Sequence, residues 1–364
     1  MTVTGETASG PTGPLGVAVV GAGYWGPNLI RNFRSSTDWD LVAVCDLDEA
    51  RARTVLGARS GVSVTASLDE LLARDDVDAV AIATPARTHQ GIALRALGAG
   101  KHVLVEKPLA DSVVNGEAMV EMARRQGLSL MADHTYCYTP AVLKIRELVA
   151  SGELGDILFV DSVRINLGLV QPDVDVFWDL APHDLSILDF VLPQGLRPLG
   201  VAAQGADPLA AGKSCVGYLS LPLARGAMAH VHVNWLSPTK IRQMVISGTR
   251  RTLVWDDLNP QQRLSVYDRG VDLEHSSATA ADRTASTISY RLGDTWAPAL
   301  PEHEALGSMV TEFADSIREQ RPSRTDGAAG LRVLRVLEAA AQSLGASGAL
   351  VAAGPTQPRL EVVG

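Results

Sequence analysis

The sequence contains little cysteine, and this excludes two kinds of site. Only three of its 364 residues are cysteines, Cys45, Cys137 and Cys215, and no two of them form a CxxC pair. Neither a disulfide framework nor a thiolate metal site is therefore expected. Cys45 and Cys215 lie in apolar strand patterns and are interpreted as buried small hydrophobic residues, whereas Cys137 stands between tyrosines near a possible cleft.

Long apolar runs and excess positive charge are also missing. No run is long enough to cross a bilayer, so a membrane is not an expected partner. The formal net charge is −9, and nucleic acid is not expected either, because a phosphate backbone requires a basic face. Residues 1–14 lack the basic and apolar regions of a signal peptide and are interpreted as a disordered tail. The cytoplasm is the expected location.

The length predicts two domains, because 364 residues exceed one ordinary hydrophobic core. The pattern of elements divides the chain into a dinucleotide-binding Rossmann domain over 15–134 and a substrate-binding and oligomerisation α+β domain over 135–345. A C-terminal tail over 346–364 follows.

The stretch from Leu15 to Asp46 organises the first domain, because it has the order of a dinucleotide-binding βαβ unit. Gly21 permits a tight turn after the first strand, Gly23 lets the backbone approach a pyrophosphate, and Gly26 allows close packing of the helix. The helix N-terminus favours phosphate. Asp46 is placed to accept both ribose hydroxyls and would repel a 2′-phosphate, so NAD is favoured over NADP.

Alternating apolar strands and helices then predict a doubly wound parallel sheet. Strands are expected at 15–20, 41–45, 61–65, 79–83, 102–105 and 128–132, and helices at 27–34, 49–56, 68–73, 89–97 and 113–125. Ligands of such sheets bind beyond the carboxyl ends of the strands. The candidate cofactor-binding residues are Gly21, Gly23, Tyr24, Trp25, Gly26, Asp46, Thr84, Pro85, His89, Glu106 and Lys107.

The second domain is predicted to hold an open, largely antiparallel sheet. A helix at 141–150 precedes seven apolar or alternating runs between 157 and 267, and helices at 304–319 and 327–344 close the fold. No element is assigned over 269–300. The uncovered face of such a sheet needs a cover, often another subunit, so a homodimer or homotetramer through this sheet is expected.

Two features point to catalysis. Only five of the 32 basic residues are lysines, and Lys107 follows a strand's carboxyl end, where a compact ammonium is chemically useful. Pro182 suits the first position of a helix continuing over 185–191, which would place His183 in the first turn and keep its imidazole neutral. Asp179 would orient His183 or Lys107. A lone histidine at a helix start is, however, more often structural.

At these residues the chain resembles the Gfo/Idh/MocA oxidoreductase family over roughly 15–344. Three motifs carry the resemblance: Gly21-Ala22-Gly23-Tyr24-Trp25-Gly26, Glu106-Lys107-Pro108 and Asp179-Leu180-Ala181-Pro182-His183. The resemblance implies oxidation or reduction of a ring carbinol with NAD(P), with Lys107, Asp179 and His183 lining the site. His183 would then take the hydroxyl proton while Lys107 stabilises the oxygen. The reverse assignment, with Lys107 as base and Asp179 as its relay, stays open.

Further motifs resemble the nucleotide-sugar 3-dehydrogenases that act on UDP-linked N-acetylglucosamine derivatives. They are Gly23–Asn28, Arg164–Gly168, Trp178–Asp184 and Trp235–Lys240. The glycine pair usual before the Asp-x-x-x-His segment is replaced by Val176-Phe177-Trp178, which leaves the sugar open.

Donors for an anionic substrate are expected on the second domain. Arg164 and Asn166 share a strand face by their spacing of two, and the substrate-binding candidates are Arg164, Asn166, Trp178 and Lys240, with Arg242 beside them. Solvated surface or subunit contact is an equal alternative. His230 and His232 also share a strand face, but no third ligand is evident, so no metal is expected.

Three functions compete. The leading hypothesis is a nucleotide-sugar dehydrogenase or ketosugar reductase. An inositol or free-sugar dehydrogenase would use the same catalytic residues. A non-enzymatic NAD-binding regulator is the third, and the joint presence of Lys107, Asp179 and His183 argues against it.

Overall fold

A computed structural model describes residues 13–57, 60–274 and 287–354. The chain forms two compact units. The first contains the residues up to Thr139 together with 303–334, and the second contains 140–302 and the residues from Arg335 onward. The tails expected at 1–14 and 346–364 fall largely outside the described residues, and the domain boundaries expected from the sequence stay predictions.

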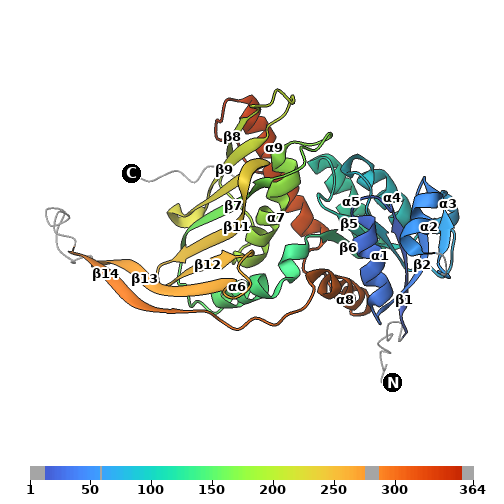
Figure 1. The fold of residues 1–364 in the computed structure, drawn as a ribbon, viewed down its shortest axis with the longest axis horizontal. Helices are drawn as coiled ribbons and strands as arrows, with labels where there is room; N and C mark the ends of the chain where they lie inside the picture. Colours follow the sequence, from blue (N-terminus) through green and yellow to red (C-terminus); the bar gives the residue numbers. More distant parts are fainter. Residues whose placement is uncertain (1–12, 58–59, 275–286, 355–364) are drawn as a thin grey trace, which may run out of the picture. The chain divides into compact units, whose positions relative to one another are not determined.

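The first unit is built on a six-stranded parallel sheet in the order β3-β2-β1-β4-β5-β6. Its strands are β1 (Leu15–Val20), β2 (Trp39–Cys45), β3 (Ser63–Thr65), β4 (Ala79–Ile82), β5 (His102–Glu106) and β6 (Leu130–Asp133). Figure 1 labels β1, β2, β5 and β6 of this sheet among the helices of the unit. Side chains of a strand alternate between the two faces, and every residue of β1 and β4 is buried. Both faces of the central strands are therefore covered, which explains why these strands are continuous apolar runs.

Helices of the first unit follow the strands as the periodicity predicts. They are α1 (Gly26–Ser35), α2 (Glu49–Leu56), α3 (Leu68–Leu72), α4 (His89–Gly98), α5 (Val113–Gln126) and α8 (Ala305–Arg318). A 3₁₀ turn, η1 (Ala86–Thr88), leads into α4. The expected doubly wound sheet is confirmed.

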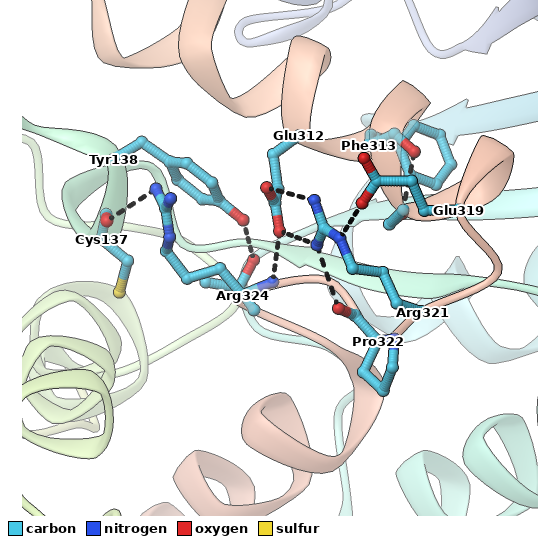
Figure 2. Close-up of polar contacts among 10 residues, drawn as sticks. Cys137, Tyr138, Glu312, Phe313, Glu319, Arg321, Pro322 and Arg324 are labelled. Carbon is cyan, nitrogen blue, oxygen red and sulfur yellow. Dashed lines mark hydrogen bonds and ion pairs between the residues drawn. The ribbon is translucent and has the colours of Figure 1, made fainter.

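The chain that follows α8 is fastened to the end of β6 by a polar cluster (Figure 2). The Glu312 carboxylate of α8 accepts from the Arg321 guanidinium at 2.8 Å and from the Arg324 backbone N–H at 2.9 Å. The Arg324 guanidinium lies 4.7 Å from the centre of the Tyr138 ring. The Tyr138 hydroxyl lies 2.9 Å from the hydroxyl of Thr325, which donates in turn to the Ala132 carbonyl. These contacts fix the carboxyl end of β6.

The second unit is built on an eight-stranded sheet in the order β14-β13-β12-β11-β7-β10-β9-β8. Its strands are β7 (Ile157–Leu167), β8 (Ala202–Ala206), β9 (Val216–Pro222), β10 (Met228–Asn234), β11 (Leu236–Gly248), β12 (Thr252–Asp256), β13 (Leu264–Glu274) and β14 (Thr287–Trp296). Only the β7–β10 pair is parallel within this described sheet. The expected largely antiparallel sheet is confirmed, and β13 and β14 occupy much of the stretch that the sequence left unassigned.

Three helices accompany this sheet: α6 (Pro140–Ala150), α7 (Val176–Val191) and the last part of α9 (Gly327–Gly345). Helix α7 packs on β7, β9 and β10. A side chain at Gly217 of β9 would collide with the Phe177 ring, 2.2 Å away. Among the described residues, no helix combines the length and the apolar character needed to span a membrane.

The start of α7 corrects one expectation from the sequence. The N-cap is Asp175, whose carboxylate accepts from the backbone N–H groups of Phe177 and Trp178 at 3.0 Å each. Pro182 therefore lies inside the helix and not at its first position. His183 stands two turns beyond the helix start, so the charge of the helix N-terminus does not account for a neutral imidazole there.

The sheet face opposite α7 carries exposed apolar side chains. Phe159, Tyr218, Met228, Tyr290 and Leu292 are all exposed. Within this face the Tyr218 ring stacks on the His232 ring, with centroids 4.4 Å apart. All three cysteines are buried, as expected for Cys45 and Cys215.

Candidate active site

The glycine turn after β1 has the geometry that a phosphate-binding turn requires. Gly21 has a φ of +99°, and a Cβ there would lie 2.8 Å from the Ala83 carbonyl oxygen. A Cβ at Gly26 would lie only 2.1 Å from the Gly21 oxygen, whereas nothing lies within 4 Å of a Cβ built at Gly23. The ends of the turn are tight and its middle is open. Tyr24 next to that opening is 96% exposed.

Asp46 holds this turn in place. Its Oδ2 accepts from the Ala22 backbone N–H at 2.6 Å, and its Oδ1 accepts from the Arg51 guanidinium at 2.5 Å and from the Asp48 N–H at 2.8 Å. Burial acts to raise the pKa of Asp46, but these hydrogen bonds hold that pKa below its ordinary value. A carboxylate is thus kept at the carboxyl end of β2. Sequence reasoning missed Arg51, which lies one helical turn into the next element.

His89 connects two other turns at the same edge of the sheet. Its Nε2 lies 2.8 Å from the Thr84 carbonyl oxygen and its Nδ1 lies 2.9 Å from the Pro108 carbonyl oxygen. Burial lowers the pKa of this histidine, and the two carbonyl contacts act in the opposite direction. Both ring nitrogens of His89 therefore contact backbone carbonyl oxygens. These contacts connect the turn of Thr84 and Pro85 to the turn that follows Lys107.

Lys107 follows the buried Glu106, the last residue of β5, and the peptide between Lys107 and Pro108 is cis. In the sheet Glu106 is in register with Asp133, the last residue of β6. Asp133 is buried as well. It was not identified from the sequence, although an aspartate that ends a buried parallel strand is itself a signal for a site at that edge.

The first unit therefore assembles its candidates on one edge. The carboxyl ends of parallel strands lie together. Gly21, Asp46 and Lys107 directly follow β1, β2 and β5, and Thr84 lies two residues after β4.

In the second unit, Asp179 and His183 lie one turn apart on the same face of α7. Asp179 Oδ2 accepts from the indole N–H of the buried Trp235 at 2.9 Å. The sequence predicts that Asp179 orients a catalytic group. In addition, the hydrogen bond from the Trp235 indole fixes the Asp179 carboxylate to the chain between β10 and β11.

Arg164 lies on the buried face of β7 and pairs with Asp184 of α7. Its Nε donates to Asp184 Oδ2 at 2.7 Å and its Nη2 donates to Oδ1 at 3.0 Å, while the Ser162 hydroxyl donates to Oδ1 at 2.9 Å. The side chains of the two ions are only 3% and 2% exposed. The sequence did not predict this partner, and the guanidinium expected to grip a substrate holds α7 on the sheet.

The other substrate-binding candidates are more accessible. Asn166 and Trp178 are half-buried and Lys240 is exposed. A Cβ at Gly168 would lie 2.7 Å from Asn166 Nδ2, so the glycine makes room for that amide. The Nη1 atom of Arg242 lies 3.5 Å from Oδ2 of Asp257. His230 and His232 lie on β10, and the described part of the chain contains no group of three metal-ligating side chains around them or elsewhere.

Comparison with known proteins identifies family models and solved structures that resemble this chain. Residues 15–134 match the family model described as an oxidoreductase family with an NAD-binding Rossmann fold, and residues 142–254 match the GFO/IDH/MocA C-terminal domain. UDP-N-acetylglucosamine 3-dehydrogenase of Acidithiobacillus ferrooxidans is 28% identical over 319 residues, which is 87% of this chain and 93% of that protein. Its crystal structure covers 91% of this chain and 98% of its own, with a TM-score of 0.76 and 26% identity.

Two further matches differ in extent. An uncharacterised oxidoreductase of Streptococcus pneumoniae is 33% identical over 156 residues, and the match spans 43% of this chain and 42% of that protein. The structure of GenD2 from gentamicin A biosynthesis, in complex with NAD, covers 96% of this chain and 99% of its own, with a TM-score of 0.75 and 26% identity. Because both family models match in the expected order, the chain belongs to the Gfo/Idh/MocA family of NAD-binding oxidoreductases.

Proposed function

We propose that this enzyme transfers hydride between a nicotinamide and a ring carbinol or ketone of a sugar, at carbon 3 of a nucleotide-linked sugar. The observation that carries the proposal is the glycine turn, open at Gly23 and held by Asp46, in a chain whose α7 presents Asp179 and His183 on one face. The full-length similarity to a UDP-N-acetylglucosamine 3-dehydrogenase supports the nucleotide sugar.

The open middle of the glycine turn and the carboxylate beyond β2 fit a dinucleotide. Gly21, Gly23 and Gly26 would receive the pyrophosphate at the start of α1, with Asp46 on the ribose. When bound, the nicotinamide supplies the hydride acceptor or donor.

The chain's own residues handle the proton and the charge. His183 takes the proton from the sugar hydroxyl, and the Lys107 ammonium donates a hydrogen bond to the same oxygen as negative charge develops on it. Asp179, fixed by the Trp235 indole, keeps its carboxylate beside His183 on α7. Exchange of the two roles, with Lys107 as base and Asp179 as relay, is the alternative that a pH–rate profile of single variants separates.

A substrate panel tests the proposal. The purified enzyme is supplied with NAD and either UDP-N-acetylglucosamine, UDP-glucose, N-acetylglucosamine, glucose or myo-inositol, and NADH formation is followed at 340 nm. We expect a UDP sugar to give the highest kcat/KM, and NMR of the product to locate the ketone at carbon 3. Turnover of the free sugars at equal kcat/KM would remove the nucleotide from the proposal.

One observation favours the second candidate, an inositol or free-sugar dehydrogenase. Arg164 was an expected donor for an anionic substrate group, and its guanidinium is held in an ion pair with Asp184. A site with one fewer basic donor binds an anionic group such as a diphosphate less strongly, and this favours an uncharged substrate. The same panel decides, because this candidate requires myo-inositol or a free sugar to exceed every UDP sugar in kcat/KM.

NAD is the preferred cofactor in this proposal, because Asp46 places negative charge where NADP carries its 2′-phosphate. Asp46→Ser should raise the Kd of NAD by about tenfold or more, since a hydrogen bond to a charged group contributes about 1.5–3 kcal/mol. The ratio of the Kd of NADP to that of NAD should fall in parallel. Isothermal titration measures both. Asp40→Ser is the matched control, because Asp40 is an exposed aspartate near the start of the same strand, and equal effects of the two variants on NAD would contradict the role of Asp46.

The exposed face of the second unit's sheet supports a homodimer or homotetramer. Phe159, Tyr218 and Met228 expose apolar surface there, and a second subunit is the expected cover. Light scattering on the purified chain should give the mass of two or four protomers. We also propose the cytoplasm as its location, and cell fractionation checks this.

A further inference from the structure

Asp133 is a buried carboxylate to which the proposed function gives no task. Its Oδ2 accepts from the indole N–H of Trp25 at 3.1 Å, and its Oδ1 accepts from the Thr135 hydroxyl at 2.5 Å. Trp25 belongs to the glycine turn and is the N-cap residue of α1. The carboxylate at the end of β6 is therefore bonded directly to the turn that is shaped for the cofactor, across 108 positions of the chain.

The strand register also brings Asp133 close to the backbone of Lys107. Neighbouring strands of a sheet are about 4.8 Å apart, and Asp133 is in register with Glu106, the residue before Lys107. Burial raises the pKa of the Asp133 carboxyl, and the positive charge of Lys107 opposes that rise. A buried carboxylate is costly unless hydrogen bonds and an opposite charge compensate it. The Thr135 hydroxyl, the Trp25 indole and, to a smaller extent, the Lys107 ammonium offset part of that cost, but burial outweighs them and the pKa of Asp133 stays above its ordinary value.

The backbone holds Asp133 in place independently of these partners. The Ala132 N–H donates to the Thr325 carbonyl at 2.8 Å, and the Thr325 hydroxyl donates to the Ala132 carbonyl at 2.7 Å. The preceding residue, Met131, bridges to Asp326. The backbone that carries the Asp133 carboxylate is thus fixed by the sheet and by Thr325. We therefore treat the carboxylate as the fixed group and the side chains of Trp25 and Lys107 as the groups that it positions.

We propose that Asp133 is a positioning residue whose single buried charge holds both the Lys107 ammonium and the Trp25 indole, so that the lysine and the cofactor turn are set from one point. The charged or titratable groups next to it in the chain or sheet are Glu106, Lys107 and His134. The catalytic importance of Lys107 rests on the proposed function, whereas the link between the three side chains does not.

Asp133→Asn is the first test, because it keeps the size of the side chain and one acceptor oxygen but removes the charge. We expect kcat to fall by about tenfold or more while the Kd of NAD changes by less than about threefold. Trp25→Phe should show the opposite split, with a weaker NAD complex and a nearly unchanged kcat. Asp78→Asn is the matched control, because Asp78 bonds the Gly16 N–H at the amino end of the same sheet and should leave both constants unchanged.

A second readout needs no substrate. The chain has only five lysines, so reductive methylation with ¹³C-formaldehyde gives one dimethylamino signal for each lysine and one for the α-amino group, and NMR can follow each of them. In Asp133→Asn the chemical shift of the Lys107 signal should change, because the neighbouring carboxyl group is replaced by a neutral amide. The signals of Lys101, Lys144, Lys213 and Lys240 should not move.

Thr135→Val covers the case in which Asp133→Asn does not fold. It removes one hydroxyl donor from the Asp133 carboxylate and leaves the cofactor turn untouched, so the carboxylate rearranges and the chemical shift of the Lys107 signal should change again. An unmoved Lys107 signal in whichever variant folds would overturn the inference. Shifted signals in an enzyme that turns over no sugar would instead overturn the proposed function and leave this inference standing.

Discussion

Replacing Lys107 or His183 by alanine should reduce kcat by about 10²–10⁴-fold while the Kd of NAD stays within about threefold of the wild-type value. Each variant removes a group that acts on the reacting oxygen or its proton, and neither removes the glycine turn or Asp46. kcat is measured at saturating sugar and NAD, and NAD binding is measured separately by titration calorimetry. Turnover that persists in both variants would show that the site has been assigned to the wrong residues.

Lys101 supplies the matched control, since it precedes the same strand that Lys107 follows. Its ammonium donates to the Arg74 carbonyl at 2.9 Å at the amino end of β5. Lys101→Ala changes the charge of the protein by the same amount as Lys107→Ala but at the edge where no ligand is expected. It should keep wild-type kcat. A loss as large as that of Lys107→Ala would show that the effect is one of net charge or folding.

The conservative variants separate the two possible bases. Lys107→Arg keeps a positive donor but cannot serve as a base near neutral pH, so it should retain part of the activity if His183 is the base. If Lys107 is the base, Lys107→Arg should be as inactive as Lys107→Ala, and His183→Gln should keep more activity than His183→Ala.

Much of the first unit could be predicted because its signals are local. The central strands β1 and β4, buried on both faces, appear as separate apolar runs, and the glycine turn is read directly from Gly21, Gly23 and Gly26. Asp46 could be placed because it ends such a run. Each of these residues owes its position to its neighbours in the chain, so the sequence carries the information.

The start of α7 shows how two local signals can compete. Pro182 is suited to the first turn of a helix, and this predicted a start too late in the chain. Asp175 is an equally good N-cap residue, and the apolar residues Val176 and Phe177 bury against the sheet. Because burial of these residues stabilises the additional helical turn, the helix starts after Asp175. Pro182 is accordingly a buried residue in the interior of the helix.

The remaining gaps concern contacts between distant residues. The sequence offered Arg164 as a substrate ligand, Asp179 as a relay and nothing for Asp133, and their partners are Asp184, Trp235 and Trp25. None of these pairs has a spacing that a helix or strand pattern would reveal. Charged residues on a strand are indistinguishable in sequence whether they face a ligand or a buried counter-ion, so only the folded chain identifies the partner.

The Arg164–Asp184 pair should give the largest effect on stability. Removing one member of a buried ion pair leaves the other charge uncompensated, and this typically costs about 3–5 kcal/mol. Arg164→Met and Asp184→Leu should each lower the free energy of unfolding by about that amount, measured by urea denaturation of the second unit's transition. Arg242→Met is the control. That pair is 34% and 21% exposed, and a partly solvated ion pair contributes only about 0–1 kcal/mol.

The double variant then separates stability from function. Arg164→Met with Asp184→Leu removes both charges and leaves apolar groups of similar volume, so it should be more stable than either single variant. The double-mutant cycle should give a coupling of more than about 1 kcal/mol, because the two residues are in direct contact. If Arg164 serves only to hold α7 on the sheet, the folded double variant keeps the KM of the wild type for the preferred sugar. A KM raised about tenfold or more in that variant, with its fold and NAD affinity intact, would instead return Arg164 to the substrate site that the sequence predicted for it.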